Sequence, residues 1–312
     1  MQRVLPAASR GAVVTLGVVL AGAAAVACGQ GHPAVFGDFV PDAGVSSSGG
    51  SGGGAGGGDG GLIGVGSSGG TPSCPVETQF VYVIDVNGNL LRFDPPTASF
   101  TKVAPITCRG SVYSMAVDRQ AYAWVLMQTG EIVRVDTRTG ACTPTAFKAG
   151  QQGFSQQFGM GFSTNGAGST DETLFVSSAA FATLAQLDLG TLTLHKVGAY
   201  DKVQARAEMT GTGDGRLFAA FEGTPYIVAE IGKSTAQVLS QAPQNAVNYP
   251  PSSSNFAFAF WGGDFYLFVG PGTSTDVFHY RPLDGVTAKL STVPFEIVGA
   301  GVSTCAPTVP PK

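Results

Sequence analysis

The sequence predicts an all-β fold, and three observations support this. Beyond Cys74 there is no convincing amphipathic helix, and short apolar or alternating runs are separated by Gly, Asp, Asn and Pro. Four kinds of segment recur in the same order at a spacing of roughly 40–50 residues, the repeat length of a four-stranded propeller blade. The end of the chain supplies the one kind of segment that the start lacks. We therefore expect a β-propeller, with five four-stranded blades closed by the C-terminal strand.

The segments take four positions in each predicted blade. The innermost kind is rich in small residues, which suits the crowded centre, and covers residues 114–117, 159–162, 208–211, 257–260 and 298–301. The second kind is more hydrophobic and covers residues 80–83, 123–126, 174–176, 217–220 and 265–268. The third kind ends in a turn and covers residues 90–94, 132–136, 184–188, 228–231 and 277–280. The fourth is a more polar edge and covers residues 100–103, 142–144, 194–197, 236–239 and 288–290.

The order of these segments predicts how the ring closes. The domain begins at a second-position segment near Phe80, and the missing innermost strand comes last, at residues 297–303. Pairing of these two ends leaves the ring without an open strand edge. A β-sandwich also contains many short strands, but it does not give this ordered fourfold recurrence.

The N-terminus has the features of an export signal, and we expect residues 1–27 to be a lipoprotein signal peptide. Arg3 and Arg10 make a positive start, and residues 12–27 form an uncharged run. That run is shorter than the about 20 residues that span a membrane, and it suits the apolar region of a signal peptide. The run ends in Ala-Val-Ala before Cys28, which resembles the bacterial lipobox. The resemblance implies lipidation of Cys28. Ordinary cleavage and secretion is the alternative.

The number of cysteines also favours lipidation. The chain has 5 cysteines, and an odd free thiol is disfavoured in an oxidising compartment. Lipidation of Cys28 leaves Cys74, Cys108, Cys142 and Cys305. If residues 297–303 lie beside residues 80–85, a Cys74–Cys305 disulfide clasps the ring, worth at most roughly 4–5 kcal/mol in the chain-entropy model. Cys108 and Cys142 then pair by elimination.

Composition divides the rest of the chain. Residues 28–73 are mostly Gly, Ser, Ala and Pro, and cannot bury enough apolar surface to offset their ordering entropy. We therefore expect a disordered tether there, the propeller over residues 74–306 and a disordered tail over residues 307–312. The net charge of −4 and the absence of Lys/Arg clusters argue against nucleic-acid binding.

Two resemblances follow from these segments. The turn Asp136-Thr137-Arg138-Thr139-Gly140 resembles the Asp-x-x-Thr-Gly corner of quinoprotein-like propeller repeats. The quinone-docking tryptophan that usually follows this corner is absent, since Trp124 and Trp261 lie elsewhere, so no cofactor is expected. Residues 114–119 with 123–126, 150–154 and 158–162 resemble a block of uncharacterised bacterial lipoprotein propellers. This resemblance covers most of the domain and implies its architecture.

Few residues suggest chemistry at the predicted axis. The candidates for an axial channel are Arg206, Glu208, Tyr113, Phe158 and Phe256. An internal salt bridge between Arg206 and Glu208 is the simplest interpretation, because a buried charge needs a partner. The histidines fall far from the axis, so we expect no catalytic triad, and we assign no catalytic or metal-ligating residue. Glu296 is the only plausible second acid for a glycosidase, which needs two carboxylates.

The sequence leads to three functional hypotheses, of which the last is a structural or assembly role without a small ligand. The first is an envelope lipoprotein, held in the bilayer through acylated Cys28, whose propeller binds a protein, a peptide or a glycan without catalysis. The second is a glycan-active hydrolase or lyase that uses Glu208 as an axial carboxylate. Gly29 rather than Asp follows Cys28, which favours the outer membrane as the location of the anchor.

Overall fold

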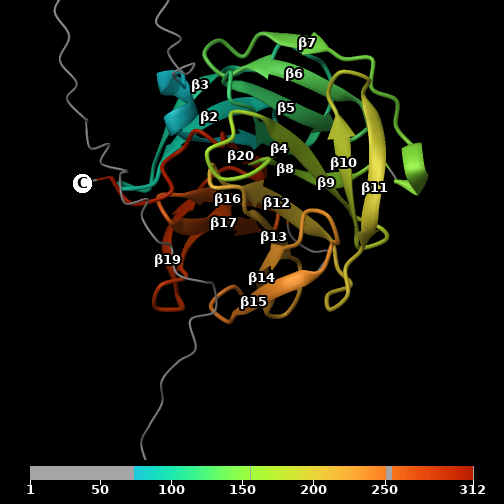
Figure 1. Ribbon diagram of the computed structural model, residues 1–312. Coiled ribbons are helices and arrows are strands. Elements are labelled where there is room, and N and C mark those ends of the chain that lie inside the picture. Colours follow the sequence, from blue (N-terminus) through green and yellow to red (C-terminus); the bar gives the residue numbers. More distant parts are fainter. Residues whose placement is uncertain (1–73, 155, 251–254, 312) are drawn as a thin grey trace, which may run out of the picture. The chain divides into compact units, whose positions relative to one another are not determined.

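The described part of the chain is a ring of five β-sheets, shown in Figure 1. This computed structural model describes residues 74–154, 156–250 and 255–311. Each sheet has four strands in antiparallel pairing. The arrangement is a five-bladed β-propeller, so the expected fold class and blade count are confirmed. The expected signal peptide and tether, and with them Cys28, lie outside the described residues.

The blades repeat four strand positions from the axis outward. The innermost strands are β20 (Ile297–Val302), β4 (Val112–Val117), β8 (Phe158–Thr164), β12 (Ala207–Gly211) and β16 (Asn255–Trp261). The second strands are β1 (Val81–Asp85), β5 (Tyr122–Met127), β9 (Glu172–Ser178), β13 (Leu217–Phe221) and β17 (Asp264–Gly270). The third strands are β2 (Asn89–Asp94), β6 (Ile132–Asp136), β10 (Thr183–Asp188), β14 (Tyr226–Ile231) and β18 (Thr275–Arg281). The outermost strands are β3 (Ser99–Pro105), β7 (Cys142–Pro144), β11 (Thr193–Ala199), β15 (Val238–Gln244) and β19 (Val286–Val293).

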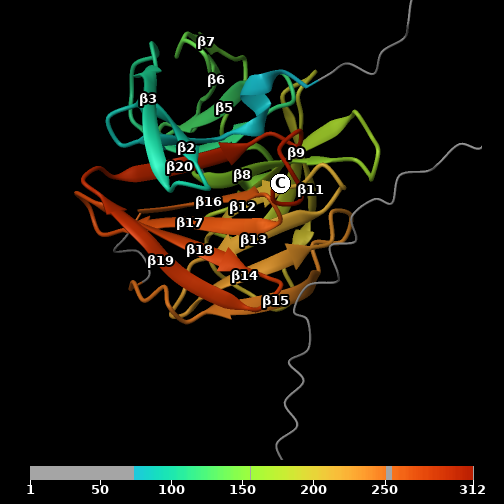
Figure 2. The same ribbon diagram turned by 90° about the vertical axis from the view of Figure 1, so that its left-hand side faces the viewer.

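Blade 1 contains both ends of the domain. It consists of β20 and β1–β3, while blades 2 to 5 consist of β4–β7, β8–β11, β12–β15 and β16–β19. Strand β20 pairs with β1, with Val81 opposite Val302 and Val83 opposite Ala300. In Figure 2 the red C-terminal strand lies beside the blue-green strands that begin the domain. The predicted closure by the last strand is therefore confirmed.

Helical structure is minor in the described ranges. It is limited there to the short 3₁₀ turns η1 (Val76–Gln79) and η2 (Gln151–Gly153). Neither turn approaches the length and apolar character that crossing a membrane requires.

Apolar side chains fill the spaces between neighbouring blades. Each space has its own buried cluster. In order around the ring, beginning between blades 1 and 2, the clusters contain the large buried side chains of Met115, Phe158, Phe221, Phe265 and Phe268. These clusters make the ring rigid because each blade buries both faces of its sheet against its neighbours. The start of every inner strand is thereby held at a fixed position around the axis.

The centre of the ring is crowded, as the small residues predicted. A Cβ added at Gly161 of β8 would come within 2.7 Å of the Met209 carbonyl carbon in β12. A Cβ at Gly211 of β12 would come within 2.2 Å of the Phe162 oxygen in β8. Only glycine allows the two backbones to approach this closely.

The start of strand β15 differs from the sequence prediction for a local reason. The outermost strand of blade 4 begins at Val238, whereas we expected it to begin at residue 236. Ala236 has a φ of 59° and donates its N–H to the Gly232 oxygen, so it belongs to the preceding turn. Hydrophobic alternation alone does not reveal this left-handed turn residue.

Candidate functional site

Glu208 lies on the innermost strand β12 and is buried near the axis of the ring. The Ser114 hydroxyl of β4 donates to Glu208 Oε2 at 2.7 Å. Strands β4 and β12 belong to blades 2 and 4, which are not neighbours, so this hydrogen bond crosses the axis. Only 3% of Glu208 is exposed, and burial raises the pKa of its carboxyl to about 8, although hydrogen bonds from Ser114 and the Met160 backbone oppose the shift. The carboxyl is therefore largely protonated at neutral pH.

Arg206 pairs with Glu222 and not, as expected, with Glu208. The guanidinium makes two contacts with the Glu222 carboxylate, from Nε at 3.1 Å and from an Nη at 2.8 Å. The reason is the strand register: Ala207 lies opposite Phe221, which brings residues 206 and 222 together at the strand end. The expected Arg206–Glu208 salt bridge is wrong, and a charged pair at the strand end takes its place.

Tyr113 and Phe256 flank this charged pair. The Arg206 guanidinium lies 4.9 Å from the centre of the Phe256 ring, which is a favourable cation–π distance. Burial raises the pKa of Tyr113, and the nearby Glu208 carboxyl adds to that rise. Phe158, the fifth candidate, is fully buried between blades 2 and 3, where Phe147 meets it edge-on at 6.1 Å. The structure thus brings Arg206, Glu208, Tyr113 and Phe256 together and places Phe158 in the core.

These residues mark one face of the ring, where the inner strands begin; we call it the starting face. Polar side chains gather there. Gln157 donates to Gln128 Oε1 at 2.7 Å, and the Asn255 amide donates to a Glu296 carboxylate oxygen. Burial raises the pKa of Glu296. The second acid considered from the sequence is therefore held by an amide, at the end of the axis where Arg206 and Glu222 also lie.

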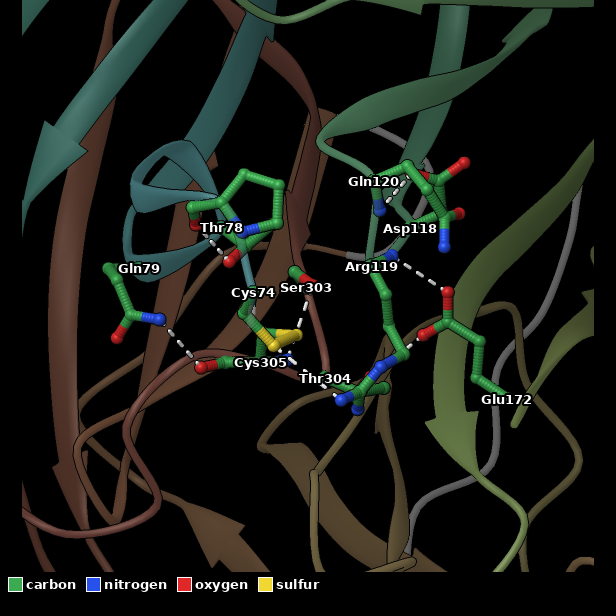
Figure 3. Close-up of a disulfide and its surroundings, with 11 residues drawn as sticks. Cys74, Thr78, Gln79, Asp118, Arg119, Gln120, Glu172, Ser303, Thr304 and Cys305 are labelled. Atoms are coloured by element: carbon green, nitrogen blue, oxygen red, sulfur yellow. Dashed lines mark hydrogen bonds between the residues drawn. A yellow bond between two sulfur atoms is a disulfide. The ribbon is translucent and has the colours of Figure 1, made fainter. Parts of the chain in front are cut away.

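The opposite face, where the inner strands end, is the closing face. Cys74 and Cys305 form the predicted disulfide there, with their Cα atoms 6.0 Å apart. Figure 3 shows Arg119 lying between this disulfide and Glu172. The Arg119 backbone N–H donates to Glu172 Oε1 at 2.8 Å, and the Thr304 hydroxyl donates to Glu172 Oε2 at 2.7 Å. The chain segment after β20 is thereby tied to blades 2 and 3.

Burial raises the pKa of Glu172 to about 7. The Arg119 guanidinium also donates to the Thr304 hydroxyl at 3.2 Å and approaches Cys74 Sγ at 3.5 Å. Together these contacts hold the disulfide and the segment after β20 against blades 2 and 3. The second predicted disulfide, Cys108–Cys142, is also present, with Cα atoms 5.5 Å apart.

Several important residues were not predicted from the sequence. Ser114 and Glu222 complete the starting face, and Arg119, Glu172 and Thr304 complete the closing face. Only the Arg206–Glu222 pair had a signal in the sequence. Arg206 precedes the innermost segment 208–211, and Glu222 follows the second-position segment 217–220. Because these two segments pair antiparallel, the residues beside them are brought together. The contacts between separate blades leave no pattern in the sequence.

Two histidines lie away from the axis, as expected. His279 of β18 contacts Asp264 at 2.8 Å and stacks on Tyr266, and His195 lies on the outermost strand β11. Among the described residues, no three or more His, Cys, Asp or Glu side chains are grouped so that they can hold a metal ion.

Comparisons with known proteins add little to this description. No family model matches the sequence. No curated protein matches it either. Among solved structures, a chain from a crystal structure of the mitotic checkpoint complex is similar, with a TM-score of 0.38 and 13% identity. The similarity covers 70% of this chain and 61% of that chain. The assignment of the propeller therefore rests on the strand order and pairing described above.

Proposed function

We propose that this chain is an envelope lipoprotein, anchored through acylated Cys28, whose propeller is a non-catalytic module that binds a protein, a peptide or a glycan. The ligand is held at the starting face, over Arg206, Tyr113 and the Gln128–Gln157 pair. A rigid ring on a long predicted tether suits recognition, because the site is preorganised while the whole module turns freely.

The observation that carries the proposal is the state of the axis. The five inner strands contain one carboxyl side chain, Glu208, and it is buried and hydrogen-bonded across the ring by Ser114. Glycoside hydrolases need a second carboxyl about 5–10 Å away with a substrate between the two. The neighbouring acids Glu222 and Glu296 are held by Arg206 and Asn255. The burial of Glu208 and the pairing of the neighbouring acids support binding at the rim over reaction at the axis.

A glycan-active hydrolase or lyase is the second candidate, and one observation favours it. A carboxyl with a pKa of about 8 holds a proton at neutral pH, which suits a general acid. The two candidates differ in what Glu208→Gln does. Gln keeps an oxygen that accepts from Ser114 but has no proton to transfer.

The test uses full-length wild-type protein and Glu208→Gln with a panel of fluorescent oligosaccharides and peptides. We expect binding by anisotropy to at least one class of probe, affinities within a few-fold for the two proteins, and no product by mass spectrometry. Product formation that Glu208→Gln abolishes, with unfolding unchanged, would show that the chain is an enzyme. Glu77→Gln, at an exposed ion pair, is the control.

Two matched substitutions locate the binding face. Gln128→Trp places a bulky ring at the starting face, and Gln120→Trp places the same ring near the other end of the same strand, β5. Both residues are exposed, so neither change disturbs the core. We expect Gln128→Trp to weaken binding of the probe by roughly tenfold or more, about 1.4 kcal/mol, and Gln120→Trp to leave it unchanged. The reverse result would place the site on the closing face.

The anchor is tested separately. In cells of the source organism, we expect metabolic labelling with a palmitate analogue to modify the wild-type protein and not Cys28→Ser. The wild-type protein should sediment with membranes, because two or three acyl chains hold a protein firmly in a bilayer. Membrane association of unlabelled Cys28→Ser at the wild-type level would refute the anchor and leave the binding proposal standing.

A further inference from the structure

A pocket lies on blade 2, away from the axis. Its volume is about 510 Å³, within the about 300–1,000 Å³ typical of small-molecule sites. It shares no residue with the axial group of Arg206, Glu208, Tyr113 and Phe256. The residues used below are Arg109, Met127, Glu131, Ile132, Phe147 and Lys148.

The pocket exists because strand β7 is short. It has 3 residues, whereas the outermost strands of the other blades have 7 or 8. The strand ends at Pro144, and the next residue makes one more backbone hydrogen bond to β6, from the Thr145 N–H to the Ile132 oxygen at 3.3 Å. The chain then turns inward, and Phe147 is buried against the core between blades 2 and 3. The space that a longer strand occupies in the other blades is open here.

The walls of this pocket are held firmly. Both half-cystines of Cys108–Cys142 line it, and the Thr107 hydroxyl accepts the Cys142 N–H at 2.9 Å. On the other side the Thr145 hydroxyl donates to the Ile132 oxygen at 2.6 Å. The disulfide therefore fixes the residue next to it, Arg109, at the edge of the pocket. A ligand meets a preformed site, which lowers the entropy cost of binding.

The lining combines an apolar floor with a cationic rim. Met127, Ile132 and Phe147 are buried beneath the opening, and Arg109, Lys148 and Glu131 are exposed around it. Within the described ranges, neither Arg109 nor Lys148 has an ion-pair partner. The rim thus has an excess of one positive charge in a chain whose net charge is −4. This pattern is complementary to an anion with an apolar body.

We propose that this blade 2 pocket binds a small amphipathic anion, with its carboxylate, phosphate or sulfonate at Arg109 and Lys148 and its apolar part over Met127, Ile132 and Phe147. The site is separate from the axial group of Arg206, Glu208, Tyr113 and Phe256. Binding of the anion therefore does not depend on whether the starting face binds a ligand.

The probe is anilinonaphthalene sulfonate, which fluoresces when its apolar rings leave water. With the full-length protein we expect saturable binding that decanoate displaces and decanol does not. Arg109→Ala and Lys148→Ala should each weaken binding by roughly tenfold, because each removes a charge-assisted contact to the anion. Arg138→Ala, an exposed arginine on the same blade but at the β6–β7 turn, is the matched control and should leave affinity unchanged.

Two further measurements separate this site from other apolar surface. Amide shifts in the presence of decanoate should be confined to residue 127 and residues 107–109, 131–133 and 142–149. Gln128→Trp should leave binding of the probe unchanged, which distinguishes this pocket from the binding site proposed at the starting face. Equal binding by Arg109→Ala, equal displacement by decanol, or shifts elsewhere on the ring would each overturn the proposal.

The disulfide gives an independent readout. Cys108→Ser with Cys142→Ser releases the wall that holds Arg109, so we expect weaker binding even where circular dichroism shows an intact β-fold. Unchanged affinity of this folded double variant would contradict the role given to the disulfide.

Discussion

At the scale of single residues, burial decides which charges the ring tolerates. Arg206 keeps its charge because Glu222 meets it with two hydrogen bonds, while Glu208 avoids the cost of a buried charge by retaining its proton. The same choice recurs at the closing face, where burial raises the pKa of Glu172 to about 7. The protein therefore holds two carboxyl protons that the unfolded chain releases at lower pH.

The two retained protons predict how stability depends on pH. An unperturbed glutamate carboxyl has a pKa of 4.5, whereas the folded pKa is about 8 for Glu208 and about 7 for Glu172. Because both values are raised, the contribution of each group is greatest below pH 4.5 and is lost as pH rises through the folded pKa. We expect the free energy of unfolding to fall across this window by at most about 1.4 kcal/mol per pH unit for each proton.

Urea unfolding of three proteins across that pH range checks this. In Glu208→Gln, the free energy of unfolding should lack the pH dependence that Glu208 contributes between pH 4.5 and about pH 8. In Glu172→Gln, it should lack the dependence that Glu172 contributes between pH 4.5 and about pH 7. Both variants should therefore gain stability relative to wild type as pH rises. A Glu208→Gln profile parallel to that of wild type would mean that Glu208 is ionised in the folded ring.

At the scale of strands, the inner strands of neighbouring blades lie so close together that they limit the size of one another's side chains. Strands β8 and β12 pack so closely that glycines 159, 161 and 211 each face backbone of the other strand. The inner strands of a narrow propeller must alternate such small residues with the few side chains that fill the centre. This explains why the innermost segments were recognisable in the sequence before any contact was known.

This packing predicts a large effect for a single methyl group. In Gly161→Ala the new Cβ would lie 2.7 Å from the Met209 carbonyl carbon, and backbone cannot move aside without parting two blades. We expect a loss of about 2 kcal/mol or more in the free energy of unfolding. Gly166→Ala is the control, since a Cβ there meets nothing within 4 Å, and it should change stability by less than about 0.5 kcal/mol. Equal effects in chemical denaturation would argue against the close approach.

At the scale of the whole domain, closure of the ring joins residues that are far apart in the sequence. The Cys74–Cys305 disulfide spans 231 residues, and Cys108–Cys142 spans 34. The chain-entropy model gives roughly 5 kcal/mol for the longer loop and roughly 4 kcal/mol for the shorter one. The longer disulfide also adjoins the Arg119–Glu172–Thr304 contacts that hold the C-terminal segment.

The two disulfides should therefore differ in what their loss does. Cys74→Ser with Cys305→Ser should lower the free energy of unfolding more than Cys108→Ser with Cys142→Ser. Hydrogen exchange should show opening of β20 from β1 in the first variant, because that pair closes the ring. Protection of β20 equal to that in wild type would mean that strand pairing alone closes the ring.

The architecture of the domain was predictable from the order of its residues. The fourfold recurrence, the small innermost segments, the last strand and both disulfides could be inferred because periodicity, residue size and cysteine number are properties of the chain read along its length. The β15 boundary could not, since it depends on a left-handed turn at Ala236.

The sites depend instead on tertiary contacts. Glu222 meets Arg206 through strand register, Ser114 reaches Glu208 across the axis, and Phe158 turns into the core between two blades. The blade 2 pocket exists because one strand stops early while another segment is tied to it by Cys108–Cys142. Each of these features follows from where the closed ring places its side chains in space, and not from their spacing along the chain.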